Sequence, residues 1–265
     1  MVSRSNLEGR RQTLRGRLLH HGPSPGNQQP PDAPEDAIAY AYRSGELELQ
    51  AYVLRPSPQM DAPFPAILYS HGGCSLSQED FEAARLFVDR GILVLLPTYR
   101  GEHGNPGSYE LFLGEVDDAR AAIEALAGLS DVDEERLYAF GYSMGGEIAA
   151  LLSLPQELSL RATGSCGPFF LRRDPFSGES MYGAPVPFDP IDREDVEARL
   201  LRTHLGEMVI PHMAFIGRED EKFSDGAWRL FDVHGAKLTV TEVPGTHDSS
   251  LLPAVRAFLN RIARR

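Results

Sequence analysis

Residues 137–152 have the sequence LYAFGYSMGGEIAALL, which is an apolar run, a serine between two glycines, and a second apolar run. The first run favours a β-strand and the second has helical spacing, so the stretch predicts a strand, a sharp turn and a helix. Gly141 and Gly145 flank Ser143 in the pattern G-x-S-x-G, where the missing side chains let strand and helix approach while the turn exposes one hydroxyl. Ordinary strand-to-helix turns also contain serine, but the flanking elements favour Ser143 as a nucleophile.

The composition predicts one large domain with an acidic surface. The chain has 265 residues, of which 42% are hydrophobic and 24% charged, enough to bury a single large core. The net charge of −12 disfavours nucleic acid and anionic membranes as partners, because both attract basic surfaces. Without a membrane-spanning run or a signal-peptide core, we expect a cytoplasmic protein. Cys74 and Cys166 are too few for a disulfide framework, and we expect both to be buried.

The order of apolar runs along the chain predicts an α/β fold. Residues 1–36 are polar and rich in arginine and proline, so we expect a flexible leader. The alternative is that its arginines form a short basic helix that touches a partner or a neighbouring subunit. Strand-like and helix-like segments alternate over residues 37–265, which predicts a mainly parallel twisted sheet with helices on both faces. Residues 37–43 and 47–54 are expected to form a hairpin at one sheet edge.

A second glycine motif follows the strand expected at residues 64–70. It is His71-Gly72-Gly73-Cys74, and glycines just past a strand let backbone N–H groups face a bound group. Acyl transfer needs two such donors for its tetrahedral oxyanion. We expect them to be the amides of Met144, which follows the serine, and of Gly73 or Cys74. The alternative is that these glycines form only a tight loop.

Residues 169–205 interrupt the alternation of strands and helices. The segment mixes aromatic residues with prolines and glycines, and it exceeds the usual length of a loop. We expect a small lid-like insertion over the site, the alternative being a packed connector. Arg172 and Arg173 lie within it and could meet a substrate carboxylate, although adjacent arginines are more often solvated.

Acyl transfer by a serine also needs a base and a carboxylate that orients the base. Asp220 follows the strand expected at residues 212–217, and His247 follows the strand expected at 237–243. Together with Ser143 they lie past the ends of parallel strands and can therefore converge on one sheet edge. No zinc, phosphate-loop or dinucleotide pattern occurs, so we expect no metal and no cofactor. The rival carboxylates are Glu219 and Glu221, and the rival bases are His71, His103 and His234.

The chain resembles the α/β-hydrolases, and within them the catalytic domain of the prolyl oligopeptidase and dipeptidyl aminopeptidase/acylaminoacyl peptidase group. The resemblance covers residues 37–265 and implies that Ser143 is the nucleophile, His247 the base and Asp220 its orienting carboxylate. We expect the catalytic domain without the N-terminal propeller of that group. The matching motifs are His71-Gly72-Gly73, Tyr99-Arg100-Gly101, Gly141-Tyr142-Ser143-Met144-Gly145-Gly146, Gly217-x-x-Asp220 and Gly245-x-His247.

These observations predict a serine hydrolase that cleaves a carboxylic ester, an amide or a short peptide through an acyl-enzyme on Ser143. Two other functions stay open, namely acyl transfer to an acceptor other than water and ligand binding without catalysis. The expected partner is a small-molecule ester, amide or short-peptide substrate, and the oligomeric state is left open. The side chains expected to bind the substrate are those of His71, Tyr99, Tyr142, Phe169 and Phe170.

Overall fold

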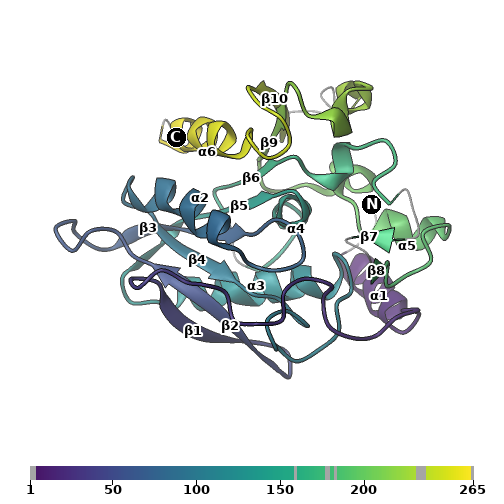
Figure 1. The fold of residues 1–265 in the computed structure, drawn as a ribbon, viewed down its shortest axis with the longest axis horizontal. Helices are drawn as coiled ribbons and strands as arrows, with labels where there is room; N and C mark the ends of the chain where they lie inside the picture. Colours follow the sequence, from purple (N-terminus) through teal and green to yellow (C-terminus); the bar gives the residue numbers. More distant parts are fainter. Residues whose placement is uncertain (1–3, 158–159, 177–179, 182–183, 231–236, 264–265) are drawn as a thin grey trace.

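A central β-sheet organises the computed structural model, which describes residues 4–157, 160–176, 180–181, 184–230 and 237–263 (Figure 1). Within these residues the sheet has eight strands in the order β1-β2-β4-β3-β5-β6-β9-β10. The strands are β1 (Ile38–Ser44), β2 (Leu47–Leu54), β3 (Phe64–Ser70), β4 (Leu93–Pro97), β5 (Val132–Tyr142), β6 (Ala162–Cys166), β9 (His212–Gly217) and β10 (Leu238–Val243).

The pairing of the strands confirms the predicted sheet. β1 and β2 form an antiparallel hairpin in which Ser44 lies opposite Leu47, and β2 also pairs antiparallel with β4. The pairs from β4 through β3, β5, β6 and β9 to β10 are all parallel. The carboxyl ends of the parallel strands therefore meet at one edge, where open α/β sheets bind their ligands.

Helices cover both faces of this sheet. α2 and α6 pack together on one face, whereas α3 and α4 pack on the other. On the α2/α6 face, the rings of Phe87 and Phe258 each lie within 6 Å of Phe140 on β5, at 5.8 and 5.3 Å between centroids. Each such buried side chain stabilises the fold by roughly 1.5–3 kcal/mol. The helices are α1 (Arg4–Arg15), α2 (Gln78–Val88), α3 (Gly114–Ala127), α4 (Met144–Leu151), α5 (Arg193–Ala198) and α6 (Leu251–Ile262).

The N-terminal residues contact the rest of the domain, whereas the sequence predicts a flexible leader over residues 1–36. α1 lies beside α5 (Figure 1) and buries Arg11 and Leu14, which are 4% and 1% exposed. Arg11 donates hydrogen bonds to the carbonyls of residues 112, 113 and 198. Composition cannot distinguish such an arginine, paired with buried carbonyls, from a solvated one.

The segment that follows α1 continues across the strand ends. The Ser24 N–H donates to the Gly101 carbonyl at 2.8 Å, and the Ser24 hydroxyl donates to the Cys74 carbonyl at 2.6 Å. A Cβ on Gly26 would lie 2.3 Å from the Cys74 carbonyl oxygen, so only glycine fits at this position. The N-terminal segment therefore packs against the glycine loop that follows β3 and helps to hold it in place.

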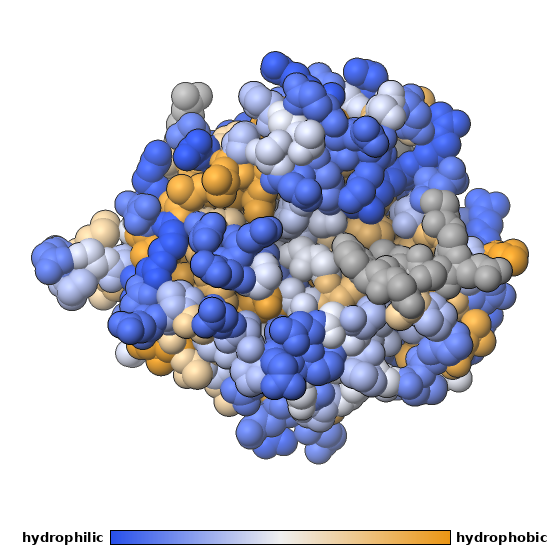
Figure 2. Space-filling model, viewed as in Figure 1, coloured by the Kyte–Doolittle hydropathy of each residue, from blue (hydrophilic) through white to orange (hydrophobic). Residues whose placement is uncertain are grey.

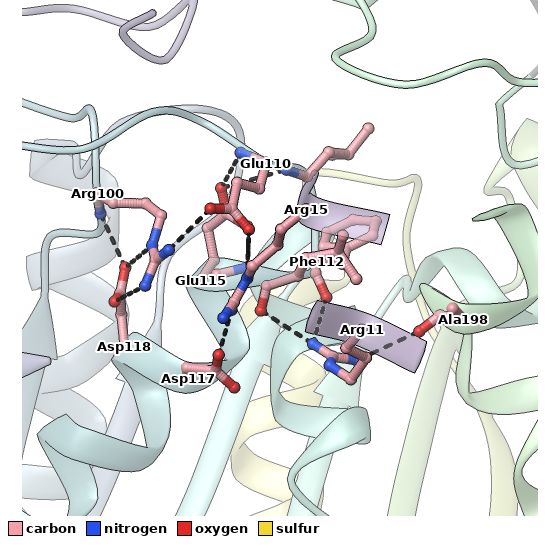
Figure 3. A network of polar contacts seen from close by, with 12 residues as sticks. Arg11, Arg15, Arg100, Glu110, Phe112, Glu115, Asp117, Asp118 and Ala198 are labelled. Atoms are coloured by element: carbon pink, nitrogen blue, oxygen red, sulfur yellow. Dashed lines mark hydrogen bonds and ion pairs between the residues drawn. The ribbon is translucent and has the colours of Figure 1, made fainter. Parts of the chain in front are cut away.

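Ion pairs connect α1 to α3 and to the loop that follows β4 (Figure 3). Arg15 pairs with Glu110 at 2.9 Å and with Asp117 on α3. Arg100 binds both oxygens of Asp118, at 2.9 and 2.7 Å, and one oxygen of Glu110, at 2.9 Å. Glu110 therefore accepts from two arginines and joins these pairs into one network.

The segment 169–205 is built from short pieces. Besides α5 it contains 3₁₀ turns at Phe169–Leu171, Leu201–Thr203 and Leu205–Glu207 and a small antiparallel pair, β7 (Ser180–Met181) and β8 (Ala184–Pro185). Four of its aromatic side chains are at most 7% exposed and join the core on the α3/α4 face, while Tyr182 lies outside the described residues. Movement of this segment as a lid stays a prediction. The buried aromatic residues are Phe169, Phe170, Phe176 and Phe188.

Hydrophilic residues cover most of the molecular face in Figure 2, with separate apolar patches between them. In the part of the chain that the structure describes, no helix combines the length and the hydrophobicity needed to cross a bilayer.

Candidate active site

Ser143 lies at a strained turn between β5 and α4. Its φ of 51° and ψ of −107° are unusual for a residue with a side chain, and such strain is characteristic of a nucleophile elbow. The two flanking glycines make the turn sterically feasible. A Cβ on Gly141 would lie 2.0 Å from the Gly145 carbonyl oxygen, and one on Gly145 would lie 2.1 Å from that of Ser70. The close approach expected from G-x-S-x-G is therefore present.

Three side chains from separate strand ends form a hydrogen-bonded chain. His247 Nε2 lies 3.0 Å from Ser143 Oγ, and His247 Nδ1 lies 2.7 Å from Asp220 Oδ2. The Ser143 residue and the Asp220 side chain are 3% and 1% exposed, while the His247 side chain is 14% exposed and so open to an incoming molecule. This geometry allows His247 to take the serine proton while its other nitrogen is held by a carboxylate.

The environment of Asp220 keeps this carboxylate ionised. Burial alone would raise the pKa of Asp220, but its hydrogen bond with His247 and the His247 charge outweigh burial, so the pKa lies below its ordinary value. The Lys222 N–H also donates to Asp220 Oδ1 at 3.0 Å. The rivals Glu219 and Glu221 are exposed, and the Glu219 carboxylate accepts instead from the Gly245 N–H at 2.6 Å.

Several neighbours fix the position of the His247 ring. A Cβ on Gly167, whose φ is 63°, would lie 2.7 Å from His247 Cε1, so a larger residue would displace the ring. The Tyr142 ring packs 5.2 Å from the imidazole, and its hydroxyl donates to Asp248 at 2.8 Å. The Ser250 hydroxyl donates to the His247 carbonyl at 3.0 Å. Sequence reasoning missed the role of Gly167, which directly follows β6 in the structure.

The predicted oxyanion donors lie together on the two facing loops. Cys74 Sγ is 3.7 Å from Met144 Sδ, so these two residues are in contact. Among the described residues, no acceptor bonds the N–H groups of Gly73, Cys74 or Met144, whereas the Gly72 N–H donates to Asp80 at 3.2 Å. The arrangement suits an oxyanion hole, a role that stays a prediction for these three residues.

A cavity of about 330 Å³ opens at Ser143 and His247, a size suited to a small ligand. Of the five predicted substrate-binding residues, only Tyr142 lines it. No sequence pattern indicated that charged residues would lie on its wall. The cavity is lined by Gly72, Gly73, Ser77, Glu79, Asp80, Tyr142, Ser143, Lys222, His247, Asp248 and Leu251.

The structure does not bring the other four predicted substrate-binding side chains to this cavity. His71 and Tyr99 are 2% and 1% exposed, and Phe169 and Phe170 are 1% and 0% exposed. His71 Nε2 binds Glu102 at 2.9 Å, and the Tyr99 hydroxyl binds that of Ser70 at 2.7 Å. These side chains therefore connect neighbouring loops instead of facing a ligand.

Of the two remaining rival bases, only His103 lies in the part of the chain that the structure describes, and it is not bonded to Ser143. The His103 ring bonds the Gln29 carbonyl, and His234 lies outside the described residues. In the described part of the chain, no group of three or more His, Cys, Asp or Glu side chains is arranged to hold a metal ion.

Replacing Glu102 with glutamine is expected to destabilise the protein more at low pH than at high pH. Burial by itself lowers the pKa of His71, but the Glu102 carboxylate outweighs burial and raises this pKa from 6.5 to about 9. The folded state therefore binds the proton more tightly than the unfolded chain. The interaction of protonated His71 with Glu102 stabilises the folded state by roughly 3 kcal/mol. This stabilisation is complete at pH values below the unfolded pKa of 6.5 and is lost as the pH rises through about 9.

Urea unfolding of wild type and Glu102→Gln across this pH range measures the effect. Glutamine is the matched replacement because its side-chain oxygen can still accept from the Tyr99 N–H, which bonds Glu102 at 2.8 Å. If the free energies of unfolding of wild type and Glu102→Gln differed by the same amount at every pH, the predicted ion pair would be contradicted.

Comparisons with known proteins give partial matches in sequence. No protein-family model matches the chain. An uncharacterized protein of Mycobacterium tuberculosis is 41% identical over 101 residues, which are 37% of this chain and 36% of the relative. The esterase FrsA of Shigella boydii is 30% identical over 113 residues, which are 42% of this chain and 27% of the esterase. The chain thus spans only 36% and 27% of the lengths of these two relatives.

Solved structures match over most of the chain. The acylaminoacyl peptidase of Pyrococcus horikoshii has a TM-score of 0.66 at 18% identity, covering 85% of this chain and 40% of the peptidase. A protein of Xanthomonas campestris, described as an α/β serine hydrolase without a lid, has a TM-score of 0.60 at 19% identity, covering 88% of this chain and 96% of that protein. The chain therefore has the α/β-hydrolase fold, and its structure resembles that of the acylaminoacyl peptidase over the part they share.

Proposed function

We propose that this chain is a serine hydrolase that cleaves a carboxylic ester, an amide or a short peptide through an acyl-enzyme on Ser143. The observation that carries the proposal is the hydrogen-bonded chain from Ser143 through His247 to Asp220, with distances of 3.0 and 2.7 Å. Its serine has the strained backbone of a nucleophile elbow. A structural serine would need neither the strain nor a histidine oriented by a buried carboxylate.

The reaction follows from the positions of these groups. Ser143 Oγ attacks the substrate carbonyl carbon as its proton moves to His247 Nε2, and Asp220 stabilises the imidazolium. The bond to the leaving oxygen or nitrogen then breaks, and this atom takes the proton from His247. Water, deprotonated by the same nitrogen, then attacks the acyl-enzyme. The bond between the acyl carbon and Ser143 Oγ breaks, Oγ takes the proton back from His247, and the carboxylic acid leaves. The amides of Met144 and of Gly73 or Cys74 would stabilise the oxyanion in both steps.

The comparisons support the reaction class more than the substrate. One sequence relative is named an esterase and one structural neighbour is an acylaminoacyl peptidase, and these names cover both ester and peptide bonds. The cavity of about 330 Å³ favours a small molecule or a short peptide over a folded protein. The net charge of −12 disfavours nucleic acid, and a cytoplasmic location remains part of the proposal.

Labelling with a fluorophosphonate probe tests the nucleophile directly. Wild type is expected to form a covalent adduct at Ser143 with loss of fluoride, and Ser143→Ala is expected to form none. Labelling that persists in Ser143→Ala would refute the assignment, whereas a folded wild type that never labels would favour a binding protein. Adding alcohols or amines to an ester assay, and looking for new acyl products, separates acyl transfer from hydrolysis.

A further inference from the structure

Arg172 brings a positive charge next to the nucleophile. Its Nη2 lies 3.4 Å from Ser143 Oγ and 3.1 Å from the Gly167 carbonyl, to which it donates a hydrogen bond. The guanidinium also stacks 3.8 Å above the centre of the Phe169 ring. An arginine held between a ring face and a carbonyl keeps its orientation, so it can offer N–H groups to a ligand in a fixed direction.

The segment that carries Arg172 is fixed to the nucleophile helix. Glu147 on α4 is fully buried, and its carboxylate accepts from the N–H of Phe170 at 2.6 Å and from that of Leu201 at 2.8 Å. These residues lie near the two ends of segment 169–205. Arg202 adds a hydrogen bond to the Arg172 carbonyl at 2.9 Å. The distance between Arg172 and Ser143 is therefore set by the fold.

Lys222 supplies a second cation on the same side of the site. It lines both the cavity at Ser143 and an adjacent cavity of about 390 Å³ that Arg172 also lines. Partial burial, followed by the positive charge of Arg172, lowers the pKa of Lys222 below its ordinary value, although the residue as a whole is exposed. Among the described residues, no carboxylate lies within ion-pair distance of the Lys222 ammonium. Arg173 also lines the adjacent cavity, where it pairs with Asp225 at 2.7 Å.

We propose that Arg172 and Lys222 bind a carboxylate on the substrate, so that the site prefers anionic esters or amides to neutral ones. This proposal rests on the proposed hydrolase function and specifies its substrate class. A charge-assisted N–H···O bond spans about 2.8 Å, so the carboxylate must lie only a few bonds from the carbonyl that Ser143 attacks. Half-esters of short dicarboxylic acids meet this condition, and so do esters whose alcohol carries the carboxylate.

Three esters of similar size test the preference and distinguish the two sides of the scissile bond. Monoethyl succinate carries the charge on its acyl group, carboxymethyl butyrate carries it on its leaving group, and ethyl butyrate is neutral. Hydrolysis is followed by pH-stat titration. We expect kcat/KM for at least one anionic ester to exceed that for ethyl butyrate by about 10- to 100-fold, with the difference shrinking as salt is added.

Matched variants assign the preference to the two cations. Arg172→Gln is expected to remove most of the anionic-to-neutral ratio, and Lys222→Gln to lower it by about 3- to 10-fold. Arg173→Gln is the control and is expected to leave the ratio unchanged, because Arg173 is engaged with Asp225. Because Lys222 is exposed, the Lys222→Gln variant should fold even if Arg172→Gln does not.

Calorimetric titration of succinate into Ser143→Ala measures binding without turnover. Binding that weakens in Ser143→Ala/Lys222→Gln would support the proposal, whereas equal binding by the two proteins, or none, would overturn it. Equal hydrolysis of all three esters by wild type would also overturn it while leaving the hydrolase function intact. Ester turnover that survives in Ser143→Ala would instead refute the hydrolase function.

Discussion

Replacing Ser143 with alanine is expected to lower kcat for any hydrolysed ester by about 10⁴-fold or more. The substitution removes the atom that forms the acyl-enzyme and leaves His247 and Asp220 without a nucleophile to activate. The methyl group of alanine fits where Cβ of serine already lies, and among the described residues the hydroxyl bonds only His247 and Arg172, both at the site. The fold should therefore survive, and the loss should appear in kcat with little change in KM.

Steady-state kinetics on purified wild type and variant, with circular dichroism to verify folding, measure this loss. Ser153→Ala is a matched control, because Ser153 is also buried and lies near α4, while its hydroxyl donates to the Ala150 carbonyl and to no other group in the described residues. Its kcat should stay within about twofold of wild type. If the two alanine variants were equally active, Ser143 would not be the nucleophile.

The proximity of Ser143, Asp220 and His247 could be predicted from the sequence because it depends on topology. Ser143, Asp220 and His247 each follow a strand of a parallel sheet, and parallel strands end at one edge whatever the loop details. Ser143 and His247 are 104 residues apart and still meet at 3.0 Å. The glycine pattern added local information, since two positions in the elbow have no room for a Cβ.

The lining of the site could not be predicted in the same way, because it depends on how loops pack. His71 and Tyr99 belong to motifs at the correct strand ends, yet both turn into the protein and bond buried partners. Arg172 and Arg173 are adjacent in sequence, but only Arg172 reaches Ser143. A sequence pattern gives no direction for a side chain in an irregular segment.

The packing of the N-terminal helix against the domain could not be predicted, because its stabilising partners lie far away in sequence. Arg11 binds carbonyls that are 101, 102 and 187 residues distant, and Arg15 joins a network that begins at Arg100. A helix with so many arginines resembles a solvated tail until the carboxylates and carbonyls opposite it are known.

Replacing Asp118 with alanine is expected to destabilise the fold by about 3–5 kcal/mol. Asp118 is fully buried on α3 and accepts three hydrogen bonds from Arg100, from its backbone N–H at 3.0 Å and from its guanidinium at 2.9 and 2.7 Å. Alanine would leave the guanidinium, whose side chain is only 11% exposed, with Glu110 as its remaining carboxylate partner. A buried cation without its counter-charge costs far more than a lost surface pair, because water cannot replace the missing carboxylate.

Urea unfolding of Asp118→Ala and Asp118→Asn separates the charge from the shape of this side chain. Asparagine keeps an acceptor for the Arg100 N–H groups but not the negative charge. The free energy of unfolding of Asp118→Asn should therefore fall between those of wild type and Asp118→Ala. Arg193→Ala is the control for an ion pair in water, since the Arg193 side chain is 90% exposed in its contact with Glu197, and no measurable change is expected. If Asp118→Ala unfolded at the same urea concentration as wild type, Glu110 alone would suffice to neutralise Arg100, and the network in Figure 3 would not require Asp118 for stability.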